Sequence, residues 1–217
     1  MKKPRLGLAL GSGSARGWSH IGVLEALAEA GIVPDIIAGC SIGALVGAAA
    51  ATGKLAELKA FALSLTWREI AKMMDVRLAS GGLVEGGEVV AMLCDLGISG
   101  PIETARLPYV AVATDLRSGR EVWMREGPIE TAVRASISLP GIFSPAQRDG
   151  HFLVDGGLVN PVPVSAARAL GADVVIAVNL NGDLVGRYGF MPKGGVSPPP
   201  ASKGTDAATP EFIARLV

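Results

Sequence analysis

Histidine and cysteine are scarce in this chain, which has two of each among 217 residues. Cys40 and Cys94 lack the paired spacing of metal ligands, and no cysteine–histidine cluster is present, so we expect no metal site and no cofactor held by one. A reduced, cytoplasmic protein is the simplest interpretation. Basic and acidic residues balance at 20 each, so the charge gives no reason to expect nucleic acid as a partner.

Long hydrophobic runs are also missing, although 49% of the residues are hydrophobic. The longest, such as residues 42–51, are interrupted by glycine and fall short of the roughly 20 residues that span a bilayer. Near the N-terminus, Lys2, Lys3 and Arg5 precede a short apolar segment, 6–10, in the manner of a signal peptide. That segment is too short and runs directly into a glycine loop, so we expect no secretory signal.

What the sequence does contain is a serine between two glycines. An apolar segment leads into Gly39-Cys40-Ser41-Ile42-Gly43, and a helix of small residues follows at 44–51. The pattern G-x-S-x-G predicts a nucleophile elbow, with the Ser41 hydroxyl raised on a sharp turn between strand and helix. The start of a helix also offers unpaired N–H groups to a developing negative charge. The alternative is an ordinary turn with an N-cap serine.

Strand and helix patterns alternate along the chain. We expect strands at 5–10, 35–39, 109–114, 121–124, 152–154 and 174–178, the last of them buried. We expect helices after the glycine loop up to Gly31 and at 44–51, 55–74, 87–96, 128–138 and 163–170. This order predicts an α/β three-layer sandwich, in which helices flank a mostly parallel central sheet.

The composition changes near residue 182. Residues 5–181 form the expected catalytic domain, and 182–208 read as a linker rich in glycine and proline or a disordered loop. Thr209-Pro210-Glu211 predicts the start of a helix that has run barely two turns by Val217, and we expect the chain to be truncated there.

Asp155 is the candidate base for Ser41. It closes an apolar strand and precedes Gly156-Gly157, which allow close approach of backbone and substrate. Partial burial would raise its pKa and make the carboxylate a useful base. An ordinary Asp-Gly turn is the alternative.

The two histidines are less suitable as the base. His20 lies among regularly spaced apolar residues and reads as a core or capping residue. His151 is about 13 Å from Asp155 along an extended strand and cannot pair with it. A triad that uses another acid, such as Asp115, stays open.

The segment Gly11-Ser12-Gly13-Ser14-Ala15-Arg16-Gly17 lies between a strand and a helix and presents backbone N–H groups to an anion. Arg16 stands where a dinucleotide fingerprint needs glycine, and no P-loop lysine follows. An oxyanion hole fits better, with the N–H groups of Ser12, Gly13 and Ser14 as donors. Arg16 would brace the loop or meet a substrate phosphate.

These elements resemble, in their order, the patatin-like phospholipase family of Ser–Asp lipid acyl hydrolases, and its bacterial branch related to neuropathy target esterase. The glycine loop, the elbow and the Asp-Gly-Gly block all match. A fourth match is the segment 135–145, Ala-Ser-Ile-Ser-Leu-Pro-Gly-Ile-Phe-Ser-Pro, which we expect to buttress the site. Ser12 departs from the glycine common at its position.

The resemblance implies a phospholipase A, lysophospholipase or esterase with Ser41 as nucleophile, Asp155 as base, a lipid or acyl-ester substrate and no metal. Acyl transfer to another alcohol and a non-catalytic adaptor or regulator are the alternatives. The helix predicted from Leu55 carries Leu65, Trp67, Ile70, Met73 and Met74, which could form a flap that touches a membrane transiently or could simply pack on the sheet. The sequence predicts no oligomeric state.

Overall fold

The structure is a computed structural model that describes residues 3–65 and 85–182. These residues belong to one compact unit, Met1–Asp183, and the second unit, Leu184–Val217, lies outside them. The linker after residue 182 and the C-terminal helix therefore remain predictions. In chain order the elements are β1 (Leu6–Leu10), η1 (Ser14–Trp18), α1 (Ser19–Glu29), β2 (Ile36–Cys40), α2 (Ile42–Thr52), α3 (Leu55–Ser64), α5 (Gly87–Asp95), η3 (Ile102–Thr104), β3 (Tyr109–Asp115), β4 (Glu121–Met124), α6 (Ile129–Ser136), β5 (Ala146–Arg148), β6 (His151–Asp155), η4 (Gly156–Leu158), α7 (Val164–Ala169) and β7 (Val174–Val178).

In the part of the chain that is described, seven strands form one mixed sheet, with hydrogen-bonded neighbours in the order β5, β6, β3, β2, β1, β7 and with β4 also paired to β3. Strands β7, β1, β2 and β3 are parallel. Strands β4 and β6 pair antiparallel with β3, and β5 pairs antiparallel with β6. The prediction of a mostly parallel sheet is therefore confirmed, with an antiparallel extension at the β5–β6 end.

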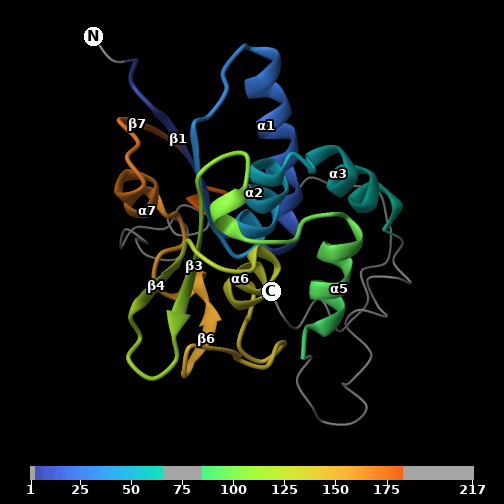
Figure 1. The fold of residues 1–217 in the computed structure, drawn as a ribbon, viewed down its shortest axis with the longest axis vertical. Helices are drawn as coiled ribbons and strands as arrows, with labels where there is room; N and C mark the ends of the chain where they lie inside the picture. Colours follow the sequence, from blue (N-terminus) through green and yellow to red (C-terminus); the bar gives the residue numbers. More distant parts are fainter. Residues whose placement is uncertain (1–2, 66–84, 183–217) are drawn as a thin grey trace, which may run out of the picture. The chain divides into compact units, whose positions relative to one another are not determined.

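Helices cover both faces of the sheet (Figure 1). The larger core lies under α1, α2, α3, α5 and α6, and includes Leu10, Val46 and Tyr109. Helix α7 covers the other face, where Ala166 and Ala167 pack with Ile36 and other strand residues. The small side chains of α2 allow this helix to lie close to the sheet, and eight of its eleven residues are buried. The expected three-layer sandwich is confirmed.

Two local predictions differ from the structure, and one strand was not predicted at all. The helix expected at 55–74 ends at Ser64, because Leu65 is extended and the Ser64 hydroxyl bonds the Phe61 carbonyl in competition with the helix; residues 66–84 lie outside the described ranges. The expected buried strand β7 lies at the edge of the sheet, and Val174 is half-exposed. Strand β5 was not predicted, since its three residues carry too little pattern of their own.

Candidate active site

Ser41 occupies a strained turn between β2 and α2. Its backbone has φ 56° and ψ −127°, a conformation that a non-glycine residue rarely adopts. The flanking glycines make the turn possible, since a Cβ on Gly39 would lie 2.5 Å from the Cα of Ala44. A Cβ on Gly43 would lie 2.2 Å from the carbonyl oxygen of Leu10. Ser41 therefore lies on a sharp turn between a strand and a helix, and its role as a nucleophile stays a prediction.

Asp155 reaches Ser41 through the register of β3. Strand β2 pairs with β3 as far as Cys40 opposite Val112, and β6 ends with Asp155 opposite Ala113. The last residues of β2 and β6 therefore lie opposite two successive residues of β3. The Ser41 Oγ donates a hydrogen bond of 2.6 Å to Oδ2 of Asp155. The structure therefore brings together the two side chains that were chosen from the sequence.

The glycines after Asp155 are required by close contacts. A Cβ on Gly156 would lie 2.2 Å from the carbonyl oxygen of Val112. A Cβ on Gly157 would lie 3.0 Å from Asp155 Oδ1 and 3.3 Å from Ser12. The Gly157 N–H donates to Asp155 Oδ1 at 2.7 Å, and so fixes the carboxylate while Oδ2 faces Ser41.

The environment of Asp155 favours its neutral form. The residue is only 4% exposed, and burial raises the pKa of its carboxyl group above the ordinary value. The hydrogen bonds from Ser41 and Gly157 lower the pKa but do not cancel the effect of burial. A carboxylate with a raised pKa is a stronger proton acceptor than one in water.

The glycine loop runs beside this pair, and its N–H groups differ in availability. Those of Gly11 and Ser12 are already donated, to the carbonyl oxygens of Val178 and Pro161. The Ser12 amide is therefore not free, contrary to the expectation that it would hold an oxyanion. Within the described residues, the amides of Gly13 and Ser14 have no such partner, nor does that of Ile42, which follows Ser41.

Two side chains anchor the loop. His20 is fully buried, as expected for a core residue, and its Nε2 lies 2.8 Å from the Gly11 carbonyl oxygen. Because a carbonyl only accepts, Nε2 carries the proton, and burial lowers the pKa of this imidazole. Asn181 donates to the backbone oxygen of Ser12 and accepts from Arg16 at 2.9 Å. Arg16 is thus linked to the loop backbone through Asn181, and its two predicted roles stay predictions.

The segment at the end of α6 contacts both candidate catalytic residues. The buried Ser136 hydroxyl accepts from the Ser41 N–H at 2.9 Å and donates to the Val112 carbonyl oxygen. The Ser138 carbonyl accepts from the Asp155 N–H at 2.9 Å. Thr114 holds the other side of Asp155, since its hydroxyl donates to the Asp155 carbonyl. These bonds are what a buttress would make.

Two clefts meet at Ser41 and Asp155. One, of about 340 Å³, is lined mainly by apolar side chains, among them Trp18, Leu45, Met92 and Phe143. The other, of about 200 Å³, is lined mainly by polar groups, which include Ser12, Arg16 and Asn181. The hydroxyl–carboxylate pair therefore lies at a boundary between an apolar and a polar surface.

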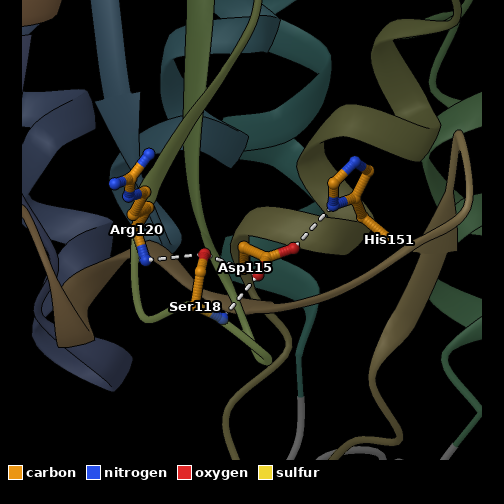
Figure 2. A network of polar contacts seen from close by, with 4 residues as sticks. All are labelled: Asp115, Ser118, Arg120 and His151. Atoms are coloured by element: carbon orange, nitrogen blue, oxygen red, sulfur yellow. Dashed lines mark hydrogen bonds and ion pairs between the residues drawn. The ribbon is translucent and has the colours of Figure 1, made fainter.

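His151 lines neither of these clefts. Its Nδ1 lies 2.7 Å from Oδ2 of Asp115, whose other oxygen accepts from the Ser118 hydroxyl and N–H (Figure 2). The bonds from Ser118 and then His151 lower the pKa of Asp115 to about 2. A histidine–aspartate pair thus exists, but Ser41 donates to Asp155 instead, and the triad through Asp115 is not formed.

In residues 3–65 and 85–182, no group of three or more metal-ligating side chains comes together. No helix in the same ranges is long and apolar enough to cross a membrane.

Comparison with known proteins supports the resemblance. The patatin-like phospholipase family profile matches residues 8–168. An uncharacterised NTE family protein of Mycobacterium tuberculosis is 40% identical over 214 residues, which are 99% of this chain and 56% of that protein. The human patatin-like phospholipase domain-containing protein 6 is 35% identical over 182 residues, 81% of this chain and 13% of that protein. Among solved structures, VipD from Legionella pneumophila superposes with a TM-score of 0.55 at 15% identity, over 75% of this chain and 47% of VipD.

The fold and the site define an α/β protein with a serine raised on a strand-to-helix turn. More narrowly, the chain belongs to the patatin-like phospholipase family. It spans about half the length of the mycobacterial relatives that it matches.

Proposed function

We propose that the protein is a serine acyl-ester hydrolase that acts on phospholipids or lysophospholipids. Membership of the family supports lipid hydrolysis in general. The observation that carries the specific proposal is the 2.6 Å hydrogen bond from Ser41 Oγ to Asp155 Oδ2, which lies within the range for direct proton transfer to a general base.

In the proposed mechanism, Ser41 Oγ attacks the acyl carbonyl carbon while its proton passes to Asp155 Oδ2. The amides of Gly13, Ser14 and Ile42 are the candidates to stabilise the oxyanion, since they have no backbone partner in the described residues. Asp155 then returns the proton to the departing alcohol or lysolipid. The same carboxylate then takes a proton from a water molecule, which attacks the acyl–Ser41 ester. Asp155 returns this proton to Ser41 Oγ as the fatty acid leaves, which restores the hydroxyl and the carboxylate.

The two clefts support a substrate with two unlike ends. An acyl chain fits the apolar cleft of about 340 Å³. The polar cleft of about 200 Å³ fits the alcohol side of the ester, where Arg16 offers a positive charge to a phosphate.

Contact with a lipid surface is part of the proposal. The clefts are lined at their edges by apolar side chains that are exposed, namely Leu139, Ile142 and Leu158. Such side chains gain from contact with lipid. Of the predicted flap residues, Leu65 lines the apolar cleft, and the others lie outside the described ranges.

Replacing Ser41 with alanine tests the function directly. We expect Ser41→Ala to abolish hydrolysis of a p-nitrophenyl ester and labelling by a fluorophosphonate probe, because both require the hydroxyl nucleophile. Ser165→Ala, on α7 at the opposite face of the sheet, is the control and should keep wild-type rates. Unchanged turnover in Ser41→Ala would remove Ser41 from the mechanism, and a wild-type protein without hydrolysis or labelling would favour an adaptor.

A further inference from the structure

A third cleft, of about 280 Å³, lies away from Ser41, between β4 and the β5–β6 hairpin. Its lining includes Arg125, Glu126, Arg148, Asp149 and His151, and none of its residues lines the two clefts at Ser41. The proposed hydrolase mechanism uses none of these side chains. The cleft therefore calls for a separate explanation.

The hairpin directs Arg148 and His151 to the same side. The two residues are directly opposite in the β5–β6 pairing, and the turn between them is Asp149-Gly150. Both turn residues have positive φ, 49° and 78°, as in a type I′ turn that fixes the register. Side chains directly opposite in an antiparallel pair have Cβ atoms about 5 Å apart on one face. Both residues line the cleft.

His151 is held with one nitrogen available. The Asp115 carboxylate can only accept a hydrogen bond, because its pKa of about 2 keeps it ionised near neutral pH. Nδ1 of His151 therefore carries the proton in the 2.7 Å contact. Figure 2 shows the second ring nitrogen turned away from Asp115. No hydrogen bond joins Nε2 to the described residues, and Nε2 becomes a donor when the imidazole is protonated.

Arg148 offers a second donor. Its Nη2 donates to the Glu126 carbonyl oxygen, and its Nε lies 3.6 Å from the Asp149 carboxylate. Its Nη1 is buried and finds no acceptor among the described residues. A buried guanidinium N–H without an acceptor is unfavourable, and such groups are normally paired.

The carboxylates near these donors hold the two arginines only weakly, so an added anion can compete with them. Asp149 is 88% exposed and Glu126 is 73% exposed, so water weakens the hold of their carboxylates on Arg148 and Arg125. Asp115 already has donors on both oxygens, from Ser118 and His151. A tetrahedral oxyanion with several acceptor atoms matches donors that come from two directions, and arginine is well suited to phosphate.

We propose that this cleft is a second binding site, distinct from the Ser41 centre, for a phosphate-type oxyanion held by the Arg148 guanidinium and His151 Nε2. Free phosphate and a phosphate monoester share this chemistry. The site does not depend on Ser41 being a nucleophile.

Histidine NMR provides a direct test, since the chain has only two histidines. At about pH 6, inorganic phosphate should shift the Cε1–H resonance of His151 in a saturable way. The resonance of His20, which contacts the glycine loop, reports any binding at the Ser41 clefts instead. The titration is run against sodium chloride at equal ionic strength. Glycerol 3-phosphate forms the second arm: tighter binding than phosphate identifies an ester as the ligand, and equal binding identifies the free anion.

Arg148→Gln should weaken the apparent affinity by at least about tenfold. Arg117→Gln is the matched control, because this exposed arginine lies in the β3–β4 turn and does not line the cleft. Should Arg148→Gln lower the melting temperature, Arg148→Lys, which keeps the charge but loses the forked geometry, should still bind more weakly than wild type. A wild-type shift that does not saturate, or equal affinity in the wild type and both Arg148 variants, would overturn the proposal.

Discussion

Two buried carboxylates in this protein have nearly the same exposure but opposite properties. Asp155 is 4% exposed and Asp115 is 5% exposed. Asp155 receives one hydroxyl and one amide, and burial raises its pKa. Asp115 receives two bonds from Ser118 and one from His151, and its pKa falls to about 2. The dominant cause of the pKa shift therefore differs: burial dominates at Asp155, whereas hydrogen bonds from Ser118 and His151 dominate at Asp115.

The largest expected effect comes from neutralising the proposed base. Asp155→Asn can keep both hydrogen bonds, since its oxygen accepts from Gly157 and its amide can donate to Ser41. It cannot accept the serine proton, so we expect kcat for a p-nitrophenyl ester to fall by about 10³- to 10⁴-fold. A steady-state assay with circular dichroism as the folding control measures this. A loss below about tenfold would show that another group accepts the proton.

The next effect concerns Ser136 as a positioning residue. Ser136→Ala leaves the Ser41 N–H and the Val112 carbonyl without their buried partner, which we expect to cost about 1–3 kcal/mol in the free energy of unfolding. Because the strained turn at Ser41 loses a restraint, kcat should fall by about 10- to 100-fold with little change in KM. Denaturant unfolding and a kcat–KM separation report the two effects. A loss of stability with unchanged kcat would leave Ser136 only a structural role.

The smallest effect tests the comparison of the two aspartates through stability. Ionised Asp115 stabilises the fold above the pKa that it has in the unfolded chain, and this contribution is lost as the pH falls toward about 2. Asp115→Asn should therefore lower Tm at pH 7, and the difference from wild type should narrow below about pH 4. For Asp155, ionisation contributes to stability with the opposite sign, because a raised pKa means that the charged form destabilises the fold. Asp155→Asn should therefore match or exceed the wild-type Tm at pH 7. Thermal unfolding across pH checks both, and Tm changes of the same sign would contradict the comparison.

The local parts of the fold were predictable from the sequence. Gly39, Gly43 and Gly156 mark places where backbone segments approach closely, and this requirement is visible in the sequence. Continuous apolar runs predicted β1, β2 and β3 nearly to the residue. Asp155 could be chosen because it closes such a run before two glycines.

Features that depend on distant partners could not be predicted. The Ser12 amide is engaged by Pro161, and Asn181 reaches Ser12 from 169 residues away. The exposure of β7 follows from its place at the sheet edge, which its apolar residues do not encode. The contact of Ser136 with the Ser41 N–H had a signal in the segment 135–145, but only as an unspecified buttress.

The pH dependence of kcat/KM for ester hydrolysis tests the central claim most directly, because its acidic limb reports the base of the free enzyme. The claim is that buried Asp155 deprotonates Ser41. The account predicts a limb governed by one ionisation, with a midpoint above the ordinary aspartate pKa of about 4 and absent from the residual activity of Asp155→Asn. A midpoint at or below that ordinary value, or an identical limb in Asp155→Asn, would contradict it.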